Sequence, residues 1–128
     1  MSQTEGENGR KRILAVDDTA VVLTRISNIL REYYEVVTVN SGVRALKYLK
    51  ENKPDLILLD IQMLPMGGIE TLQAIRNMND RADVPVIMLT GVEDKDIVLE
   101  TAKLGIRDYI LKSSSSDELL QRIRRVFE

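Results

Sequence analysis

The chain has 128 residues, a formal net charge of −2, and neither histidine nor cysteine. Its length suits one domain with a sizeable core, and its charge predicts no general attraction to nucleic acid or to anionic membranes. The missing residue types exclude disulfides, thiolate nucleophiles, histidine bases and histidine or cysteine metal sites, so any chemistry must use carboxylates, hydroxyls, lysine, backbone amides or a hard cation.

The polar residues 1–10 show no periodicity, and we expect them to form a disordered leader before one domain over residues 11–128. No apolar run approaches the length of a membrane span, and no signal-peptide core precedes Ile13. The cytoplasm is therefore the expected location.

The first part of the domain alternates strand and helix patterns. Short runs of aliphatic, β-branched or aromatic residues indicate strands, and apolar residues three or four apart indicate amphipathic helices. The predicted elements are a strand at Ile13–Val16, a helix from Ala20 to about Arg31, a strand at Tyr34–Val39, a turn at Asn40–Gly42 and a helix carrying Leu46 and Leu49.

The central element is the run of four aliphatic residues Leu56–Leu59, which follows Pro54 and ends at Asp60. The run is too short for an ordinary helix, and it indicates a strand buried on both faces in the middle of a parallel sheet. The residues after it, Gln62–Gly68, are typical of a turn. A carboxylate at the end of such a strand lies where open α/β sheets place their functional sites.

The second half repeats the alternation. The predicted elements are a helix at Ile69–Met78, a polar loop at Asn79–Asp83, a strand at Val84–Leu89, a helix from Asp94 to Leu104 that Gly105 ends in the left-handed conformation, a strand at Arg107–Leu111, a loop at Ser113–Ser116, and a last helix carrying Leu119, Leu120, Ile123, Val126 and Phe127.

Five strands alternating with five helices predict an α/β fold, a five-stranded parallel sheet with helices on both faces and right-handed connections. Doubly wound sheets of this size commonly take the flavodoxin-like strand order 2-1-3-4-5, with the switch point between the first and third strands.

In that order, polar residues at several strand ends converge on one edge of the sheet. Asp17 and Asp18 leave the first strand about 4.8 Å, one strand spacing, from Asp60. Thr90 ends the neighbouring strand, and Lys112 ends the fifth strand within reach of the third. Each residue alone has an ordinary structural explanation, such as a helix cap or a solvated terminal charge. Together they predict a site.

Three carboxylates packed together repel one another unless a cation or a proton intervenes. Oxygen ligands favour a hard ion that keeps several waters, for which Mg²⁺ is the natural choice. Beside Lys112, the Thr90 hydroxyl and the Gly91 amide, such an ion would form a clamp for a phosphoryl group. Asp60, at the centre, is placed to act as the nucleophile and to form an acyl phosphate.

The chain resembles the receiver domains of bacterial two-component response regulators, the superfamily of chemotaxis regulators, over about residues 11–128. The resemblance rests on motifs in the family's order and approximate spacing: Asp17-Asp18, Asp60, the Met63–Gly68 loop, Thr90-Gly91 and Tyr109–Lys112.

The resemblance implies a signalling switch, not a multiple-turnover enzyme, that a histidine kinase or histidine phosphotransfer protein phosphorylates on Asp60. It implies that Mg²⁺ binds Asp17, Asp18, Asp60 and the backbone carbonyl of Gln62. It also implies that Thr90, Gly91 and Lys112 contact the phosphoryl group and that the ring of Tyr109 turns inward when Thr90 moves.

The surface expected to change comprises the fourth helix, the fifth strand and the last helix, and it would control a partner or output domain that the sequence does not identify. Its charges would suit a partner or could simply be solvated: Glu93, Asp94 and Asp96 at one helix start, and Arg122, Arg124 and Arg125 near the chain end.

Two positions depart from the family pattern. Leu64 stands where many members have proline, with Pro65 one residue later, so the backbone path of this loop is open. Ser113 stands where a proline with a cis bond usually follows the lysine, and a cis bond before another residue costs about 3–4 kcal/mol. The reach of Lys112 and the setting of the last helix are therefore open too.

Three other functions fit these residues less well. A haloacid dehalogenase-like, Mg²⁺-dependent aspartyl phosphatase would have a second aspartate two residues after the nucleophile, where this chain has Gln62. A flavodoxin-like flavin binder would need a phosphate-binding loop after the first strand, where Asp17 and Asp18 would repel phosphate. A non-phosphorylated docking module would normally have lost some of the acidic, threonine or lysine positions, and all are present.

Overall fold

Within the described residues, 9–91 and 94–128 of this computed structural model, five strands alternate with five helices. The elements in chain order are β1 (Arg12–Val16), α1 (Ala20–Leu30), β2 (Glu35–Val39), α2 (Gly42–Glu51), β3 (Leu56–Asp60), α3 (Gly68–Arg76), β4 (Val86–Thr90), α4 (Lys95–Ala102), β5 (Asp108–Leu111) and α5 (Ser116–Val126). Residues 1–8 of the predicted leader lie outside the described part.

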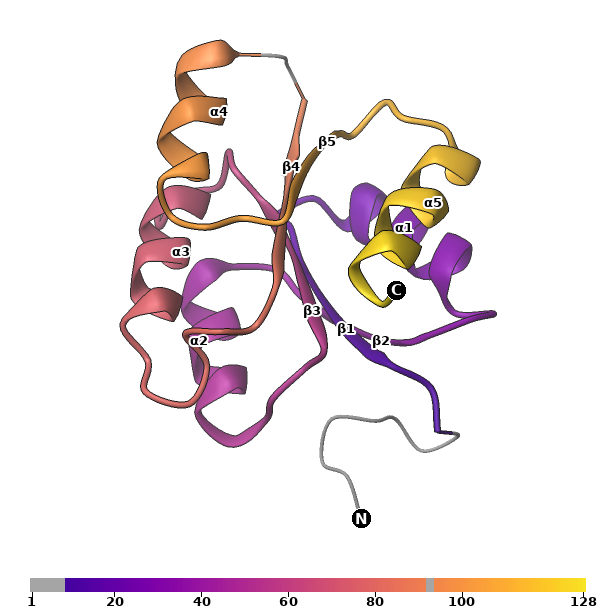
Figure 1. The fold of residues 1–128 in the computed structure, drawn as a ribbon, viewed down its shortest axis with the longest axis horizontal. Coiled ribbons are helices and arrows are strands. Elements are labelled where there is room, and N and C mark those ends of the chain that lie inside the picture. Colours follow the sequence, from indigo (N-terminus) through magenta and orange to yellow (C-terminus); the bar gives the residue numbers. More distant parts are fainter. Residues whose placement is uncertain (1–8, 92–93) are drawn as a thin grey trace.

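The strands form one parallel sheet in the order β2-β1-β3-β4-β5, which confirms the predicted α/β class and strand order. Helices α2, α3 and α4 cover one face, and α1 and α5 cover the other (Figure 1). No helix in the described residues is long and apolar enough to cross a membrane.

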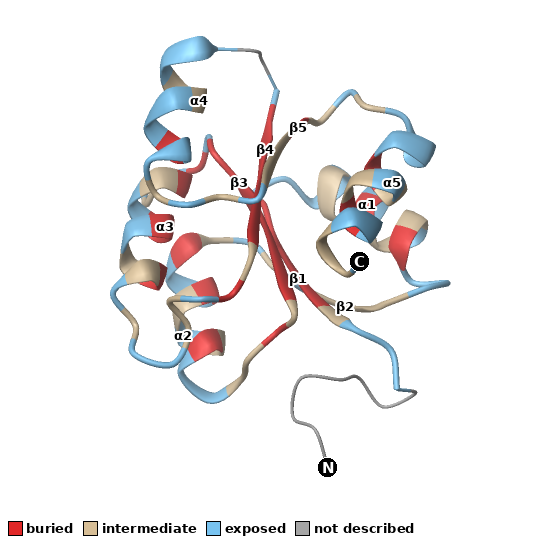
Figure 2. Cartoon of the chain, viewed as in Figure 1, coloured by how far each residue is buried: buried red, intermediate tan, exposed pale blue. Residues whose placement is uncertain are grey.

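The strands β1, β3 and β4 are buried along almost their whole length, whereas the helices are buried only on the side facing the sheet (Figure 2). This burial explains why the central strands are continuous apolar runs and the helices are amphipathic.

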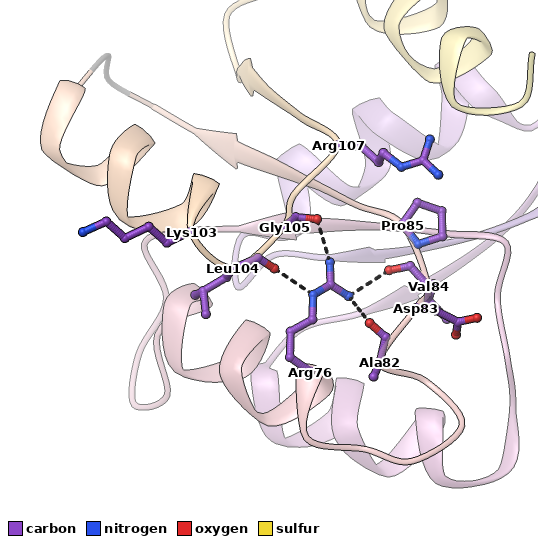
Figure 3. Close-up of a pocket in the computed structure, with 9 residues that line it drawn as sticks. All are labelled: Arg76, Ala82, Asp83, Val84, Pro85, Lys103, Leu104, Gly105 and Arg107. Atoms are coloured by element: carbon purple, nitrogen blue, oxygen red, sulfur yellow. Dashed lines mark hydrogen bonds between the residues drawn. The ribbon is translucent and has the colours of Figure 1, made fainter.

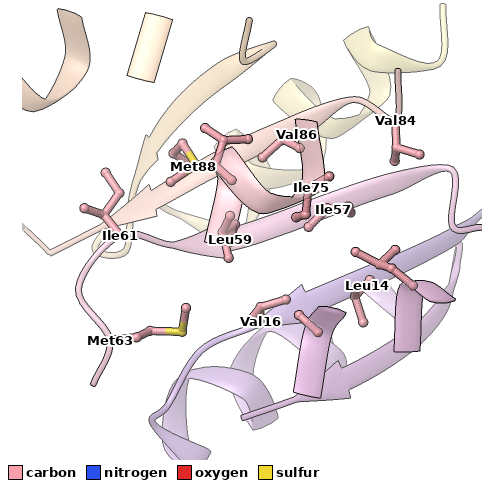
Figure 4. Packing of buried hydrophobic residues seen from close by; sticks show 13 residues of the cluster. Leu14, Val16, Ile57, Leu59, Ile61, Met63, Ile75, Val84, Val86 and Met88 are labelled. Atoms are coloured by element: carbon pink, nitrogen blue, oxygen red, sulfur yellow. The ribbon is translucent and has the colours of Figure 1, made fainter. Parts of the chain in front are cut away.

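Successive side chains of each strand enter different layers of the core. In β3, Ile57 and Leu59 join the layer under α2 and α3 (Figure 4), and Leu56 and Leu58 join the layer under α1 and α5. This alternation is a consequence of the two-residue period of a strand. By the same period Asp60 belongs to the side of α1 and α5.

Some boundaries differ from the sequence prediction. β4 begins at Val86, not Val84, because the Val84 amide donates to the Arg81 carbonyl in the preceding turn and Pro85 has no amide hydrogen. α3 ends at Arg76, not Met78, because the Met78 amide bonds to Ile75 in a tighter turn. Gly105 has the predicted positive φ, +74°, after α4.

The amino ends of β4 and β5 are joined by Arg76, the last residue of α3. Its guanidinium donates hydrogen bonds of 2.9 to 3.2 Å to four backbone carbonyls, those of Ala82, Val84, Leu104 and Gly105 (Figure 3). An open hollow of about 480 Å³ beside it is lined partly by Lys103 and Arg107. This hollow lies at the edge opposite the carboxyl ends of the strands, so it is separate from the predicted site.

Candidate functional site

The site is built by the carboxyl ends of four parallel strands. Val16, the last residue of β1, pairs with Leu59 of β3, so the following residues Asp17 and Asp60 come to the same edge. Asp60 pairs with Leu89 of β4, the residue before Thr90. Pairing along the sheet therefore brings these polar residues together although they are far apart in the sequence.

The three predicted carboxylates form one cluster. Asp17, Asp18 and Asp60 each offer an oxygen within 4.8 Å of the others. Asp17 and Asp60 are fully buried, whereas Asp18 is exposed. Two carboxylates that cannot reach bulk water need a positive partner.

Lys112 supplies that partner from the end of β5. Its Nζ lies 2.8 Å from Oδ2 of Asp17 and 3.0 Å from Oδ1 of Asp60. Burial by itself lowers the pKa of this ammonium, but hydrogen bonds and charge from the two aspartates outweigh it and raise the pKa. Lys112 thus stays protonated at the centre of the site.

The pKa of Asp60 is raised to about 6. Burial is the main cause, and repulsion from Asp17 adds to it; Lys112 and the Gln62 amide act in the opposite direction. One lysine therefore does not compensate fully for two buried carboxylates.

The donor set fits a hard cation. Oδ2 of Asp60 is buried and accepts no hydrogen bond from any described residue, and for Oδ2 of Asp17 the described contact is the ion pair with Lys112. Buried carboxylate oxygens whose charge is not neutralised are suitable ligands for Mg²⁺. The chain has no histidine or cysteine that would favour another metal.

The loop from β3 to α3 has a defined path despite Leu64. The Gln62 amide donates to Oδ1 of Asp60 at 3.2 Å, and the Leu64 amide donates to Oδ2 of Asp18 at 3.4 Å. The Gly68 amide closes the loop on the Ile61 carbonyl at 2.9 Å. The loop therefore packs against the acidic cluster, with a cis Leu64–Pro65 bond and with the Leu64 side chain exposed.

Thr90 and Tyr109 lie on the β4 and β5 side of the site. Thr90 is buried. The ring of Tyr109 is partly buried against the core layer that contains Met88, its neighbour on β4. The Tyr109 hydroxyl accepts a 3.4 Å hydrogen bond from the Asp94 amide at the start of α4. Tyr109 is thus linked to α4, while the predicted Glu93 lies outside the described residues.

The bond between Lys112 and Ser113 is trans, since the cis bond found in the described residues is Leu64–Pro65. Lys112 nevertheless reaches both aspartates. The turn after it is held by Arg25 of α1, whose guanidinium donates to the carbonyls of Lys112 and Ser114. Sequence reasoning missed Arg25, because an exposed arginine on an amphipathic helix carries no distinguishing signal.

Known proteins are similar to this chain in sequence and in fold. A family model described as the response regulator receiver domain matches residues 13–124. The chain is 38% identical over 108 residues to the transcriptional regulatory protein ZraR of Klebsiella oxytoca, covering 84% of this chain and 24% of ZraR. It is 35% identical over 116 residues to the DNA-binding response regulator MtrA of Mycobacterium tuberculosis, covering 90% of this chain and 50% of MtrA.

The similarity extends to a kinase. The CAI-1 autoinducer sensor kinase/phosphatase CqsS of Vibrio cholerae is 34% identical over 115 residues, which cover 88% of this chain and 17% of CqsS. The chain thus spans at most about half the length of these relatives.

Among solved structures, the chemotaxis protein CheY4 of Vibrio cholerae superposes with a TM-score of 0.87 at 29% identity, covering 91% of this chain and 98% of that one.

Proposed function

Because this chain belongs to the family of response regulator receiver domains, we propose that it is a signalling switch that accepts a phosphoryl group on Asp60. The observation that carries the proposal is the different surroundings of the two oxygens of the Asp60 carboxylate. One oxygen lies 3.0 Å from Lys112, and the other is buried without a hydrogen bond from the described residues. A carboxylate in this state is oriented, and it retains a free oxygen for a new bond.

The expected donor is a phosphohistidine of a histidine kinase or of a histidine phosphotransfer protein. An oxygen of Asp60 attacks the phosphorus, an O–P bond forms, the N–P bond breaks, and its electron pair returns to the imidazole. The occurrence of similar domains in response regulators and in a sensor kinase supports a kinase as partner.

The metal would be Mg²⁺, held by Asp17, Asp18, Asp60 and the backbone carbonyl of Gln62. When bound, it would neutralise negative charge on the carboxylates and on the incoming phosphoryl oxygens. Lys112 already neutralises part of this charge and would move its Nζ towards the phosphoryl group.

The response would start at Thr90 and Gly91, which lie at the end of β4 and would hydrogen-bond the phosphoryl oxygens. Thr90 pairs with Leu111 of the neighbouring β5, and Tyr109 lies two residues before Leu111. The ring of Tyr109 would follow Thr90 inward and release its hydrogen bond to Asp94. The surface of α4, β5 and α5 would then present a changed face to an output domain or target protein in the cytoplasm.

The domain would return to its resting state by hydrolysis of one acyl phosphate, and it would not turn over a substrate repeatedly. The position where a haloacid dehalogenase-like phosphatase needs its acid is Gln62, an exposed amide. We expect no direct binding of nucleic acid or membrane by this domain, since its net charge is −2.

Intact-protein mass measurement after incubation with a small acyl phosphate and Mg²⁺ tests the proposal. We expect one phosphoryl adduct, and we expect it to disappear in Asp60→Asn or when the metal is chelated. Asp80→Asn, which alters an exposed aspartate outside the site, should retain it. An adduct at the wild-type level in Asp60→Asn, or repeated turnover of a phosphate ester, would exclude the proposed switch.

A further inference from the structure

We propose that Arg25 is a positioning residue, which fixes the backbone that carries Lys112 and so determines where the Lys112 ammonium lies. Arg25 is on α1, 87 residues before Lys112 in the sequence. Its guanidinium donates to the Ser114 carbonyl at 2.7 Å and to the Lys112 carbonyl at 3.3 Å. One planar group thus holds two carbonyls of the turn that leads from β5 to α5.

The backbone of Lys112 is held from two sides. Its amide donates to the Thr90 carbonyl at 2.7 Å, which fixes it to β4. Its carbonyl accepts from Arg25, which fixes it to α1. The Ser114 amide closes the turn on the Leu111 carbonyl at 3.0 Å. Among these bonds, those from Arg25 are the ones that attach the turn to α1.

The turn takes little part in the apolar packing beside it. A hollow of only about 10 Å³ lies between α1, β5 and the start of α5, and its lining includes Arg25, Lys112 and Leu119. The turn itself contains three serines, Ser113, Ser114 and Ser115, which bring little apolar surface. Hydrogen bonds from Arg25 therefore supply a restraint that side-chain packing does not.

The residue after Lys112 gives that restraint a role. Ser113 does not lock its φ angle, whereas a proline would fix φ near −65°. The long lysine side chain amplifies small rotations of its backbone into large displacements of Nζ. Two bonds from a rigid, permanently charged guanidinium restrict those rotations without a proline.

This position of Nζ matters because Lys112 makes the ion pairs with Asp17 and Asp60. Without Arg25, we expect the ammonium to spend less time between the two carboxylates. The kinetic consequence rests on the proposed function, since slower phosphoryl transfer requires that Asp60 is the acceptor. The structural consequence does not, because it concerns the resting protein alone.

The variants are Arg25→Ala, Arg25→Lys and, as a matched control, Arg44→Ala, which removes an exposed arginine from α2. The first readout is the NMR order parameter of the Lys112 side chain and of the amides of residues 112–115 in the unphosphorylated protein. Arg25→Ala should lower these order parameters, and Arg25→Lys should lower them less, since an ammonium on a flexible stem holds the turn less firmly. The control should not change them.

The second readout is the rate of phosphorylation by a small acyl phosphate with Mg²⁺. Arg25→Ala should slow it by about three- to tenfold, because the loss of two hydrogen bonds loosens the group that contacts the phosphoryl oxygens. In a Lys112→Ala background the same change should alter the rate by less than about twofold, since a residue acting through Lys112 has nothing left to position.

Unchanged order parameters at Lys112 in Arg25→Ala would overturn the proposal, and so would an equal slowing with and without Lys112, which indicates a general structural role. If Arg25→Ala does not fold, Arg25→Lys is compared with the wild type by the same readouts. If the wild-type protein accepts no phosphoryl group, the proposed function fails, and the order parameters of the resting protein still decide the role of Arg25.

Discussion

At the scale of single residues, the site holds more negative charge than its buried positive partner compensates. Asp17 and Asp60 are fully buried, and Lys112 is the one ammonium that contacts both in the described residues. The cluster therefore keeps excess negative charge in a place with little water. That excess would favour the binding of a divalent cation, and it raises the free energy of the ionised resting site.

The raised pKa of Asp60 predicts a pH-dependent effect of Asp60→Asn on stability. The pKa is about 6 in the folded protein and 3.8 for an unperturbed aspartate, so ionisation of Asp60 costs the folded state. Stability due to this group is present at low pH and is lost as pH rises from about 4 through about 6. Without metal, Asp60→Asn should therefore be more stable than the wild type by about 1–3 kcal/mol near neutral pH.

This difference should shrink towards zero as the pH falls to about 4, where the wild-type carboxylate is itself largely protonated. Urea denaturation at several pH values in the presence of a chelator measures it. A difference that is independent of pH would show that charge on Asp60 is not its cause.

Asp18 should matter mainly for the metal. It is exposed and belongs to the carboxylate cluster, so Asp18→Ala should weaken Mg²⁺ binding by about tenfold or more. The stability of the metal-free protein should change little, because the relief of repulsion opposes the loss of the hydrogen bond from the Leu64 amide. Titration with Mg²⁺, followed by chemical shifts near Asp60, measures the affinity. An unchanged affinity would contradict the role proposed for Asp18.

At the scale of elements, the loop between β3 and α3 depends on a glycine at its end. A Cβ on Gly68 would overlap the carbonyl oxygen of Asp60 and would lie 2.7 Å from the Cα of Ile61. These are backbone atoms at the end of the central strand, which cannot move aside without disturbing the site. The absence of a side chain at position 68 therefore lets α3 begin directly against the end of β3.

We expect Gly68→Ala to destabilise the protein by about 1–3 kcal/mol through this overlap and to slow phosphorylation of Asp60. Gly67→Ala is the matched control, since a Cβ there would meet its nearest atoms at 3.9 Å. Thermal unfolding of both variants measures the effect. Equal melting temperatures for the two would show that the close approach of Gly68 to β3 is not required.

Among the described helices, α4 has the fewest buried residues. Thr101 is the only fully buried residue among the eight of α4, whereas α3 buries Gly68, Thr71, Leu72 and Ile75 among its nine. A helix with so little buried surface can shift at low cost. Its start is connected to β5 by the hydrogen bond from Asp94 to Tyr109.

At the scale of the whole molecule, these features predict a route from Asp60 to a distant surface. Beryllium fluoride, an acyl phosphate mimic, should change the amide chemical shifts of Tyr109 and of α4 as well as those of the loops around Asp60. The physical reason is that a phosphoryl group attracts Thr90, and Tyr109 then repacks. The energy difference between the two states must be a few kcal/mol for one modification to reverse their populations.

Two-dimensional NMR of the wild type and of Asp60→Asn, each with and without beryllium fluoride and Mg²⁺, measures this route. The variant should show no change in α4. Shifts confined in the wild type to the loops around Asp60 would mean that phosphorylation is not transmitted to α4 in this protein.

Local sequence patterns were enough to predict the elements, the class of fold and the acidic residues at the strand ends. Apolar runs such as Leu56–Leu59 and the helix spacing of α1 are local patterns, and burial on two faces or on one produces them directly. The strand order came from a rule for sheets of this kind and brought Asp60, Thr90 and Lys112 to one edge, and the resemblance to receiver domains then implied their roles.

The way in which the site is held follows from contacts between elements, which no local pattern predicts. Lys112 contacts Asp17 and Asp60 from a different strand, and Arg25 bonds to the turn from a different helix. The raised pKa of Asp60 likewise results from burial between elements and from its neighbour Asp17. Such contacts depend on how the elements pack in space, and an exposed arginine reveals nothing of that packing in the sequence.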